Sequence, residues 1–160
     1  MIRPTRHLLA TLMLIFCSFP IAAEPLSPWG GAPELTRTYS KQKVVFDTHT
    51  SSIEDLVSVL DRASYISKLN GADPFDSKIV IVLHGGVIPF FGSKNYAKYK
   101  DLMKRAQSLS VGGIIEFRMC KVSAQSLGYA PKDIHGFVSM VPMGDAEIIQ
   151  LQQEGYAYMQ

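Results

Sequence analysis

Apolar residues recur along this chain in two patterns, as short continuous runs and as longer stretches with helical spacing. The runs predict strands, and the most apolar of them, residues 78–83, has the character of a strand that is buried on both faces of a sheet. Further strands are predicted at residues 43–47, 114–119, 136–141 and 156–159. We therefore expect about five strands, with the last one at an edge of the sheet.

The stretches with helical spacing alternate with these strands and predict helices. Ser51 and Glu54 form a capping box at the start of the first helix, and Asn70–Gly71 ends it. Further helices are expected at residues 96–109, 123–127 and 145–154. Strands that alternate with helices indicate an α/β fold, in which a mostly parallel sheet carries helices on both faces.

The beginning of the chain has the organisation of a secretory signal peptide. Arg3 and Arg6 precede an apolar stretch at residues 8–19, and small residues lead to an expected cleavage site after Ala23. The apolar stretch is shorter than the roughly 20 residues that span a bilayer. We therefore expect a periplasmic or secreted protein that has no membrane partner after cleavage.

Cleavage changes the bulk properties of the chain. It separates a signal peptide, a Pro/Gly-rich tail and a folded domain, at residues 1–23, 24–42 and 43–160. Loss of Arg3 and Arg6 reduces the 16 Lys and Arg to 14, which balances the 14 Asp and Glu, so the 137 residues that remain of 160 have no net charge. Because a nucleic-acid-binding protein usually has a basic excess on one face, no nucleic-acid partner is expected.

Cleavage also removes Cys17 and leaves Cys120 as the single cysteine. An internal disulfide is then impossible, as is dithiol chemistry within one chain. Cys120 follows a predicted strand, precedes a short helix and is flanked by Arg118 and Lys121. Nearby cations and helix N-termini favour the nucleophilic thiolate over the thiol. Persulfide formation, a mixed disulfide with a partner and metal ligation all remain open to this residue.

Ligands of open α/β sheets bind beside the carboxyl ends of the strands. In this chain the residues at three of these ends are Asp47 with His49, then His84 with Gly85 and Gly86, and finally Cys120. Arg118 is expected on the same strand face as Cys120, because side chains alternate along a strand. The sequence therefore indicates a site in which Cys120 is the reactive group and the pocket is lined by His84, His49, Gly85, Gly86 and Arg118.

Four segments of the folded domain have a recognisable pattern: Leu83–Gly86, Phe117–Cys120, Val141–Gly144 and Gly155–Tyr158. Together they resemble the DsrE/DsrF-like family of sulfur-relay and related proteins, over about residues 43–160, and in particular its exported, single-cysteine members. The resemblance implies a compact three-layer α/β/α sandwich that assembles into a homo-oligomer, a trimer or a hexamer. It also implies that Cys120 carries a persulfide between a sulfur donor and an acceptor, which are partner proteins or small sulfur compounds.

Two other functions are compatible with the sequence. Cys120, His84 and His49 can together ligate a soft ion such as Cu(I) or Zn(II), although the chain has no compact metal motif and no resident metal is assigned. Alternatively, the protein is a non-catalytic assembly subunit, in which the apolar loop at residues 87–91 forms a subunit contact or a lid. In that loop, Phe90 and Phe91 either face outward or fold into the core. No cofactor is expected, because a Gly-rich phosphate loop is absent.

Overall fold

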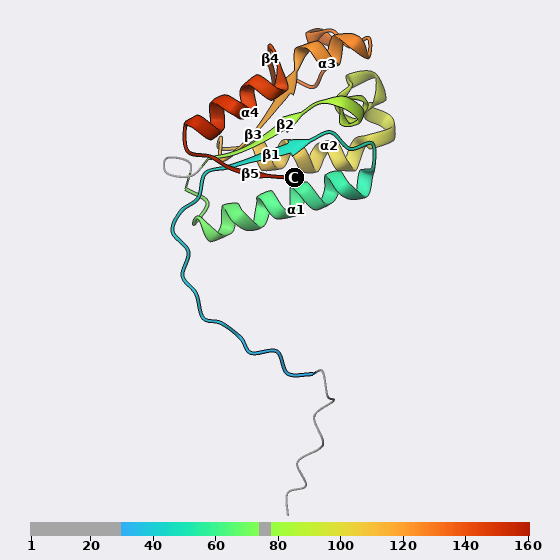
Figure 1. Ribbon diagram of the computed structural model, residues 1–160. Helices are drawn as coiled ribbons and strands as arrows, with labels where there is room; N and C mark the ends of the chain where they lie inside the picture. The colour runs from blue at the N-terminus through green and yellow to red at the C-terminus, as the bar shows by residue number, and fades with distance from the viewer. Residues whose placement is uncertain (1–29, 74–77) are drawn as a thin grey trace, which may run out of the picture. The chain divides into compact units, whose positions relative to one another are not determined.

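The computed structural model describes residues 30–73 and 78–160 (Figure 1). The expected signal peptide and the first part of the predicted tail lie outside these described residues. Residues 30–43 contain no helix or strand. Among the helices in the described part of the chain, none is both long enough and apolar enough to cross a membrane.

Five strands form one sheet in the order β4-β3-β2-β1-β5, and every neighbouring pair is parallel. The strands are β1 (Val44–Thr48), β2 (Ile79–Leu83), β3 (Ile115–Cys120), β4 (Val138–Val141) and β5 (Ala157–Met159). The predicted α/β class is therefore confirmed, and β5 is an edge strand as expected. Because all the strands run in the same direction, their carboxyl ends meet along one side of the sheet, which we call the C-terminal rim.

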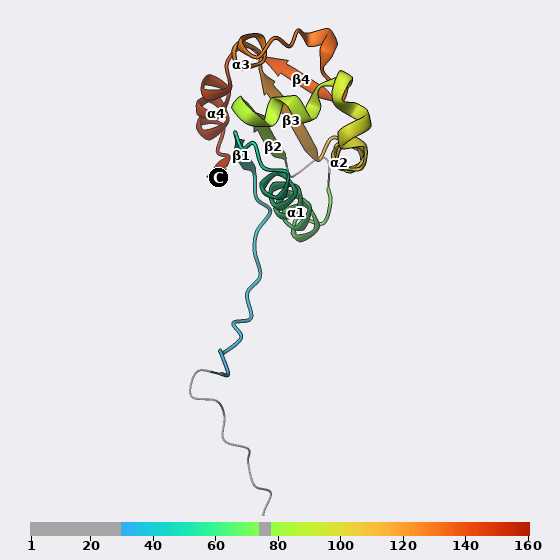
Figure 2. The same cartoon turned by 90° about the vertical axis from the view of Figure 1, so that its right-hand side faces the viewer.

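Helices cover both faces of the sheet and complete the predicted three-layer sandwich (Figures 1 and 2). One face carries α1 (Ile53–Leu69) and α2 (Tyr96–Ser110), and the other carries α4 (Gly144–Gln153). The shorter elements are α3 (Lys121–Ser126) and the 3-10 helices η1 (Gly85–Phe91), η2 (Ser93–Asn95) and η3 (Pro131–Asp133). Both α3 and η1 begin at the C-terminal rim, directly after β3 and near the end of β2.

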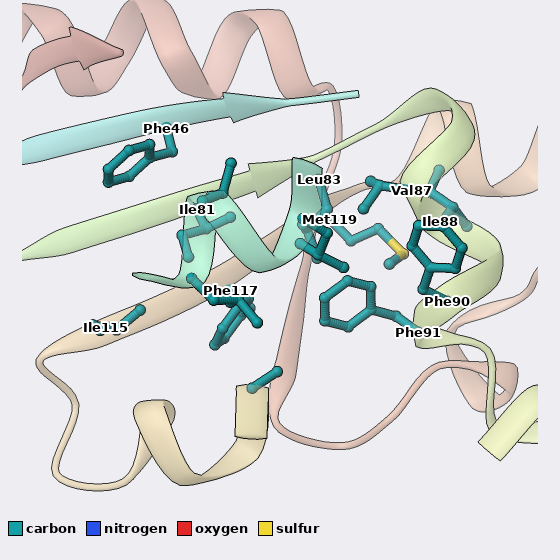
Figure 3. Packing of buried hydrophobic residues seen from close by; sticks show 14 of the residues in the cluster. Phe46, Ile81, Leu83, Val87, Ile88, Phe90, Phe91, Ile115, Phe117 and Met119 are labelled. Atoms are coloured by element: carbon teal, nitrogen blue, oxygen red, sulfur yellow. The ribbon is translucent and has the colours of Figure 1, made fainter. Parts of the chain in front are cut away.

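Alternate residues of each strand point to different faces and form two hydrophobic clusters. In the larger cluster, Phe46, Ile81 and Phe117 pack under α1, α2 and η1 (Figure 3). Val80 and Val82 point the other way, into a smaller cluster with residues of α4. This period of two also places Arg118 and Cys120 on the face that α4 covers.

Residues 85–91 form the helix η1 instead of the expected apolar loop. Phe90 is 5% exposed, and Phe91 is fully buried. The Phe91 ring lies 5.8 Å from that of Phe117 in the larger cluster (Figure 3). The suggestion that these phenylalanines form an exposed contact or lid is therefore wrong, and the alternative, that they fold into the core, is confirmed.

Two helices near the C-terminal rim begin at residues other than those predicted. The N-cap of α1 is Ser52, not Ser51, because the Ser52 hydroxyl accepts a hydrogen bond of 3.1 Å from the backbone N–H of Asp55. α3 begins two residues earlier than predicted, and Cys120, the last residue of β3, is its N-cap. The strand thus passes into the helix at Cys120, without an intervening loop.

Candidate functional site

Cys120 ends β3 beside Val141 of the edge strand β4. Its side chain is buried, with 6% of the residue exposed. The sulfur accepts a hydrogen bond of 3.4 Å from the backbone N–H of Ser123, in the first turn of α3. A backbone donor directed at sulfur stabilises negative charge there more than it stabilises a neutral thiol.

Cys120 and His84 line one pocket, which has a volume of about 240 Å³. Its other walls come from the start of α3 and from the start of α4 with its N-cap, namely Val122, Ser123, Met143, Gly144 and Asp145. Gly144 lies against the thiol, since a Cβ atom added there would be 3.2 Å from the Cys120 Cβ and 3.7 Å from the sulfur. The pocket is smaller than the typical site of a drug-sized ligand, so its size is that of a site for a small molecule.

His84 joins this pocket to the end of β1. Its Nε2 lies 2.5 Å from Oδ1 of Asp47, and the Tyr158 hydroxyl donates a hydrogen bond of 2.7 Å to Oδ2. Burial acts to raise the Asp47 pKa, but the hydrogen bonds from His84 and Tyr158 and the charges of His84 and His49 outweigh it, so that this pKa lies below its ordinary value. Asp47 is therefore a carboxylate at neutral pH, and the proton between the two groups belongs to Nε2 of His84.

The turn after β2 is tied to the segments that follow β1 and β3. The backbone N–H of Gly86 donates to the carbonyl of His49 at 3.2 Å, and that of Gly85 donates to the Ser123 hydroxyl at 2.8 Å. Gly85 has a φ of +62°, which a residue with a side chain rarely adopts. A Cβ atom on Gly86 would be 2.5 Å from the Ser51 hydroxyl. The two glycines therefore let the turn approach both neighbours closely.

The structure brings together only part of the predicted site. His84 lies in the pocket of Cys120, but His49 lines a different pocket, of about 370 Å³, together with Asp47 and Arg62. Gly85 and Gly86 shape the turn and are not among the residues that line the Cys120 pocket. Of the residues expected around the thiol, His84 is thus the one that lines its pocket.

Arg118 has a different environment from the expected one. It shares the strand face of Cys120, but its guanidinium donates to Glu116 at 2.5 Å and is also paired with Glu147 of α4. It does not line the Cys120 pocket. The carboxylates of Glu116 and Glu147 therefore balance the positive charge of Arg118, which was expected to act on the thiol.

The metal ligands suggested by the sequence are also separated. Within the described residues, His49 and His84 gather with Asp47, and their ligand atoms lie within 4.8 Å of one another. Cys120 does not belong to this group. The structure therefore does not bring Cys120 together with His49 and His84 as a soft-metal site.

Three residues of the site were missed by sequence reasoning: Ser123, Gly144 and Tyr158. Gly144 and Tyr158 lie in segments that carry the family resemblance, which is a signal that they matter. Their roles depend on contacts between distant segments, of Gly144 with Cys120 and of Tyr158 with Asp47. No local pattern in the sequence indicates such contacts.

Comparisons with known proteins agree with this fold. The family model described as the DsrE/DsrF-like family matches residues 43–160. The solved structure of MTH1491, a protein of unknown function from Methanobacterium thermoautotrophicum, is similar, with a TM-score of 0.54 and 21% sequence identity over 74% of this chain and 97% of that one. This likeness shows a shared fold alone. None of the curated proteins matches the chain.

Proposed function

The chain belongs to the DsrE/DsrF-like family, and from this premise we propose that it is an exported sulfur carrier in which Cys120 holds sulfane sulfur as a persulfide. The observation that carries the proposal is the setting of Cys120. Cys120 is the last residue of β3 and lies at the C-terminal rim. Its thiol lines a small pocket with His84 and accepts a hydrogen bond from a backbone N–H. A pocket of this kind can receive a small sulfur donor and stabilise a sulfur anion.

The loading reaction transfers one sulfur atom to the thiolate. With thiosulfate as donor, Sγ of Cys120 attacks the outer sulfur, the sulfur–sulfur bond of thiosulfate breaks, and sulfite leaves with the bonding electron pair. The product is a persulfide anion on Cys120, and no external oxidant is needed. Nε2 of His84 faces Asp47, which leaves the other ring nitrogen as the one that can accept a proton. We assign His84 the role of taking the thiol proton.

Intact-mass analysis tests this function directly. The native protein is incubated with thiosulfate or polysulfide, alkylated and weighed, and we expect the mass of one added sulfur atom on Cys120. Cys120→Ser should gain no sulfur, because it lacks the only thiol in residues 24–160. If wild type gains no sulfur, or if Cys120→Ser gains as much as wild type, the protein is not a Cys120 persulfide carrier.

Burial of Cys120 favours a second candidate, a non-catalytic assembly subunit in which the thiol is structural. The two functions differ in the reaction of the folded protein with a small thiol reagent. A carrier reacts through its pocket while folded, whereas a structural thiol reacts only after denaturation. Thiol titration with and without denaturant therefore separates the carrier from the assembly subunit.

Export and assembly form part of the same proposal. We expect the mature protein to begin at Glu24, in the periplasm or outside the cell, and to form a homotrimer or a homohexamer. N-terminal sequencing of the native protein from cell fractions checks the cleavage site. Sedimentation velocity over a range of concentrations checks the assembly. A cytoplasmic chain that keeps residues 1–23 contradicts export, and a monomer at every concentration contradicts assembly.

A further inference from the structure

Asp47, His49 and His84 form a cluster beside the Cys120 pocket, and we propose that this cluster binds a divalent transition-metal ion of the zinc class. Its three ligand atoms lie within 4.8 Å of one another. Two imidazoles and one carboxylate are a set with which proteins hold Zn²⁺ while leaving a coordination position open. The proposal goes beyond sulfur transfer, because none of its ligands is the thiol.

The spacing of the ligand atoms is close to that of a metal site. Nε2 of His84 lies 2.5 Å from Oδ1 of Asp47, and Nδ1 of His49 lies 4.0 Å from the same oxygen. Ligand atoms at about 2.1 Å from a tetrahedral zinc ion are roughly 3.4 Å apart. Binding therefore requires His84 to release its Nε2 proton, because a ligating imidazole nitrogen must be deprotonated. It also requires His84 and Asp47 to separate slightly and Nδ1 of His49 to move closer to Oδ1 of Asp47 than 4.0 Å.

The fold already orients two of the three ligands. Tyr158 donates to Oδ2 of Asp47, which leaves Oδ1 directed at the histidines. The backbone N–H of His84 donates to the carbonyl of Thr48, which ties the ends of β1 and β2 together. Partners that hold the ligands in this way are typical of metal sites in proteins.

The third ligand is the one that can move. The His49 side chain is 62% exposed and follows the end of β1, and its ring centre lies 5.5 Å from that of His84. An exposed side chain changes rotamer at little cost. The cluster therefore needs a rotation of His49 and no rearrangement of the sheet.

The surroundings leave room for the open coordination position. Asp47 and His49 line the pocket of about 370 Å³, which also contains Arg62 and Thr48. A water molecule at the open position of the ion can therefore lie in this pocket, beside Asp47 and His49.

Calorimetric titration of the full protein with ZnCl₂ tests this inference. We expect one ion per chain and a loss of affinity of at least about tenfold in His49→Ala, because it removes a ligand. His135→Gln is the matched control, since it removes the other described histidine, which lies outside the cluster. Both His135→Gln and Cys120→Ser should keep the wild-type affinity. Tyr158→Phe should lower it by about 10-fold to 100-fold, as expected for a partner that orients a ligand.

Absence of stoichiometric zinc binding by wild type would overturn the inference, as would wild-type affinity in His49→Ala or loss of binding in Cys120→Ser. If His49→Ala fails to fold, His49→Gln provides the same test with a side chain closer in size. The absorption spectrum of the protein with CoCl₂ gives a second measurement of the ligands. We expect the spectrum of an ion bound by imidazole and carboxylate, without the contribution of a thiolate ligand. Sulfur loading of His49→Ala separates the two proposals, because persulfide formation should persist when metal binding is lost.

Discussion

Tyr158 donates a hydrogen bond of 2.7 Å to Asp47, which lies 111 residues earlier in the chain. The bond connects the edge strand β5 to β1, and the same carboxylate accepts a hydrogen bond from His84 in the Cys120 pocket. The orientation of the histidine beside the thiol thus depends in part on a residue at the edge of the sheet.

We expect Tyr158→Phe to raise the Asp47 pKa, because the Tyr158 hydrogen bond is one of the interactions that hold this pKa below 3.8. The carboxyl carbon shift of Asp47, followed by NMR against pH, measures the change. Tyr65→Phe is the matched control, since Tyr65 is an exposed tyrosine of α1. An unchanged Asp47 pKa in Tyr158→Phe contradicts the role given to this bond.

Asp47 also makes stability depend on pH in the acid range. Its pKa is lower in the folded protein than the ordinary value of 3.8, so its contribution is fully present above that value and is lost as the pH falls through the folded pKa. We therefore expect the free energy of unfolding of wild type to fall more steeply below pH 3.8 than that of Asp47→Asn. Urea unfolding at a series of pH values measures both slopes, and equal slopes would show that Asp47 makes no such contribution.

Gly86→Ala should destabilise the protein. The added Cβ would lie 2.5 Å from the Ser51 hydroxyl and 3.2 Å from its Cα, and overpacking of this kind typically costs about 1–3 kcal/mol. Gly136→Ala is the matched control, because apart from its chain neighbours no atom lies within 4 Å of a Cβ at that position. Chemical denaturation compares the two variants. Equal stability of Gly86→Ala and Gly136→Ala is the result that would refute the close approach of the turn to Ser51.

Gly144→Ala should slow the reaction of the native thiol with a small alkylating reagent. The new methyl group would lie 3.2 Å from the Cys120 Cβ and 3.7 Å from its sulfur, which narrows the pocket around the thiol. The rate of iodoacetamide labelling measures this effect, with Gly136→Ala again as the control. If Gly144→Ala reacts at the wild-type rate, the reagent does not reach the sulfur past Gly144.

The alternation of strands and helices was predictable because it is local. A continuous apolar run such as residues 78–83 and the helical spacing after Ser51 each carry their own signal. Parallel strands then bring their carboxyl ends to one rim, which is why the sequence could place His84 near Cys120. The strand and helix limits shifted by only one or two residues near Cys120, where Cys120 ends the strand and caps the helix.

The features that could not be predicted are contacts between side chains that lie far apart in the sequence. Arg118 has two carboxylates within reach, and the structure pairs it with both, away from the thiol. Phe90 and Phe91 belong to an apolar run without a clear period, so the sequence could not show which way they face. His49 and Cys120 lie at the same rim but line different pockets, since β2 lies between the ends of β1 and β3.

The pairing of β5 with β1 has a consequence for the order in which the protein acquires its structure. β1 emerges early in synthesis, but its outer edge has no neighbour until β5 has also been made. Contacts between such distant segments form late and slowly in folding, and an unpaired edge invites pairing with another chain in the meantime. The growing chain therefore passes through a stage in which β1 is vulnerable to aggregation and Asp47 still lacks the tyrosine that orients it.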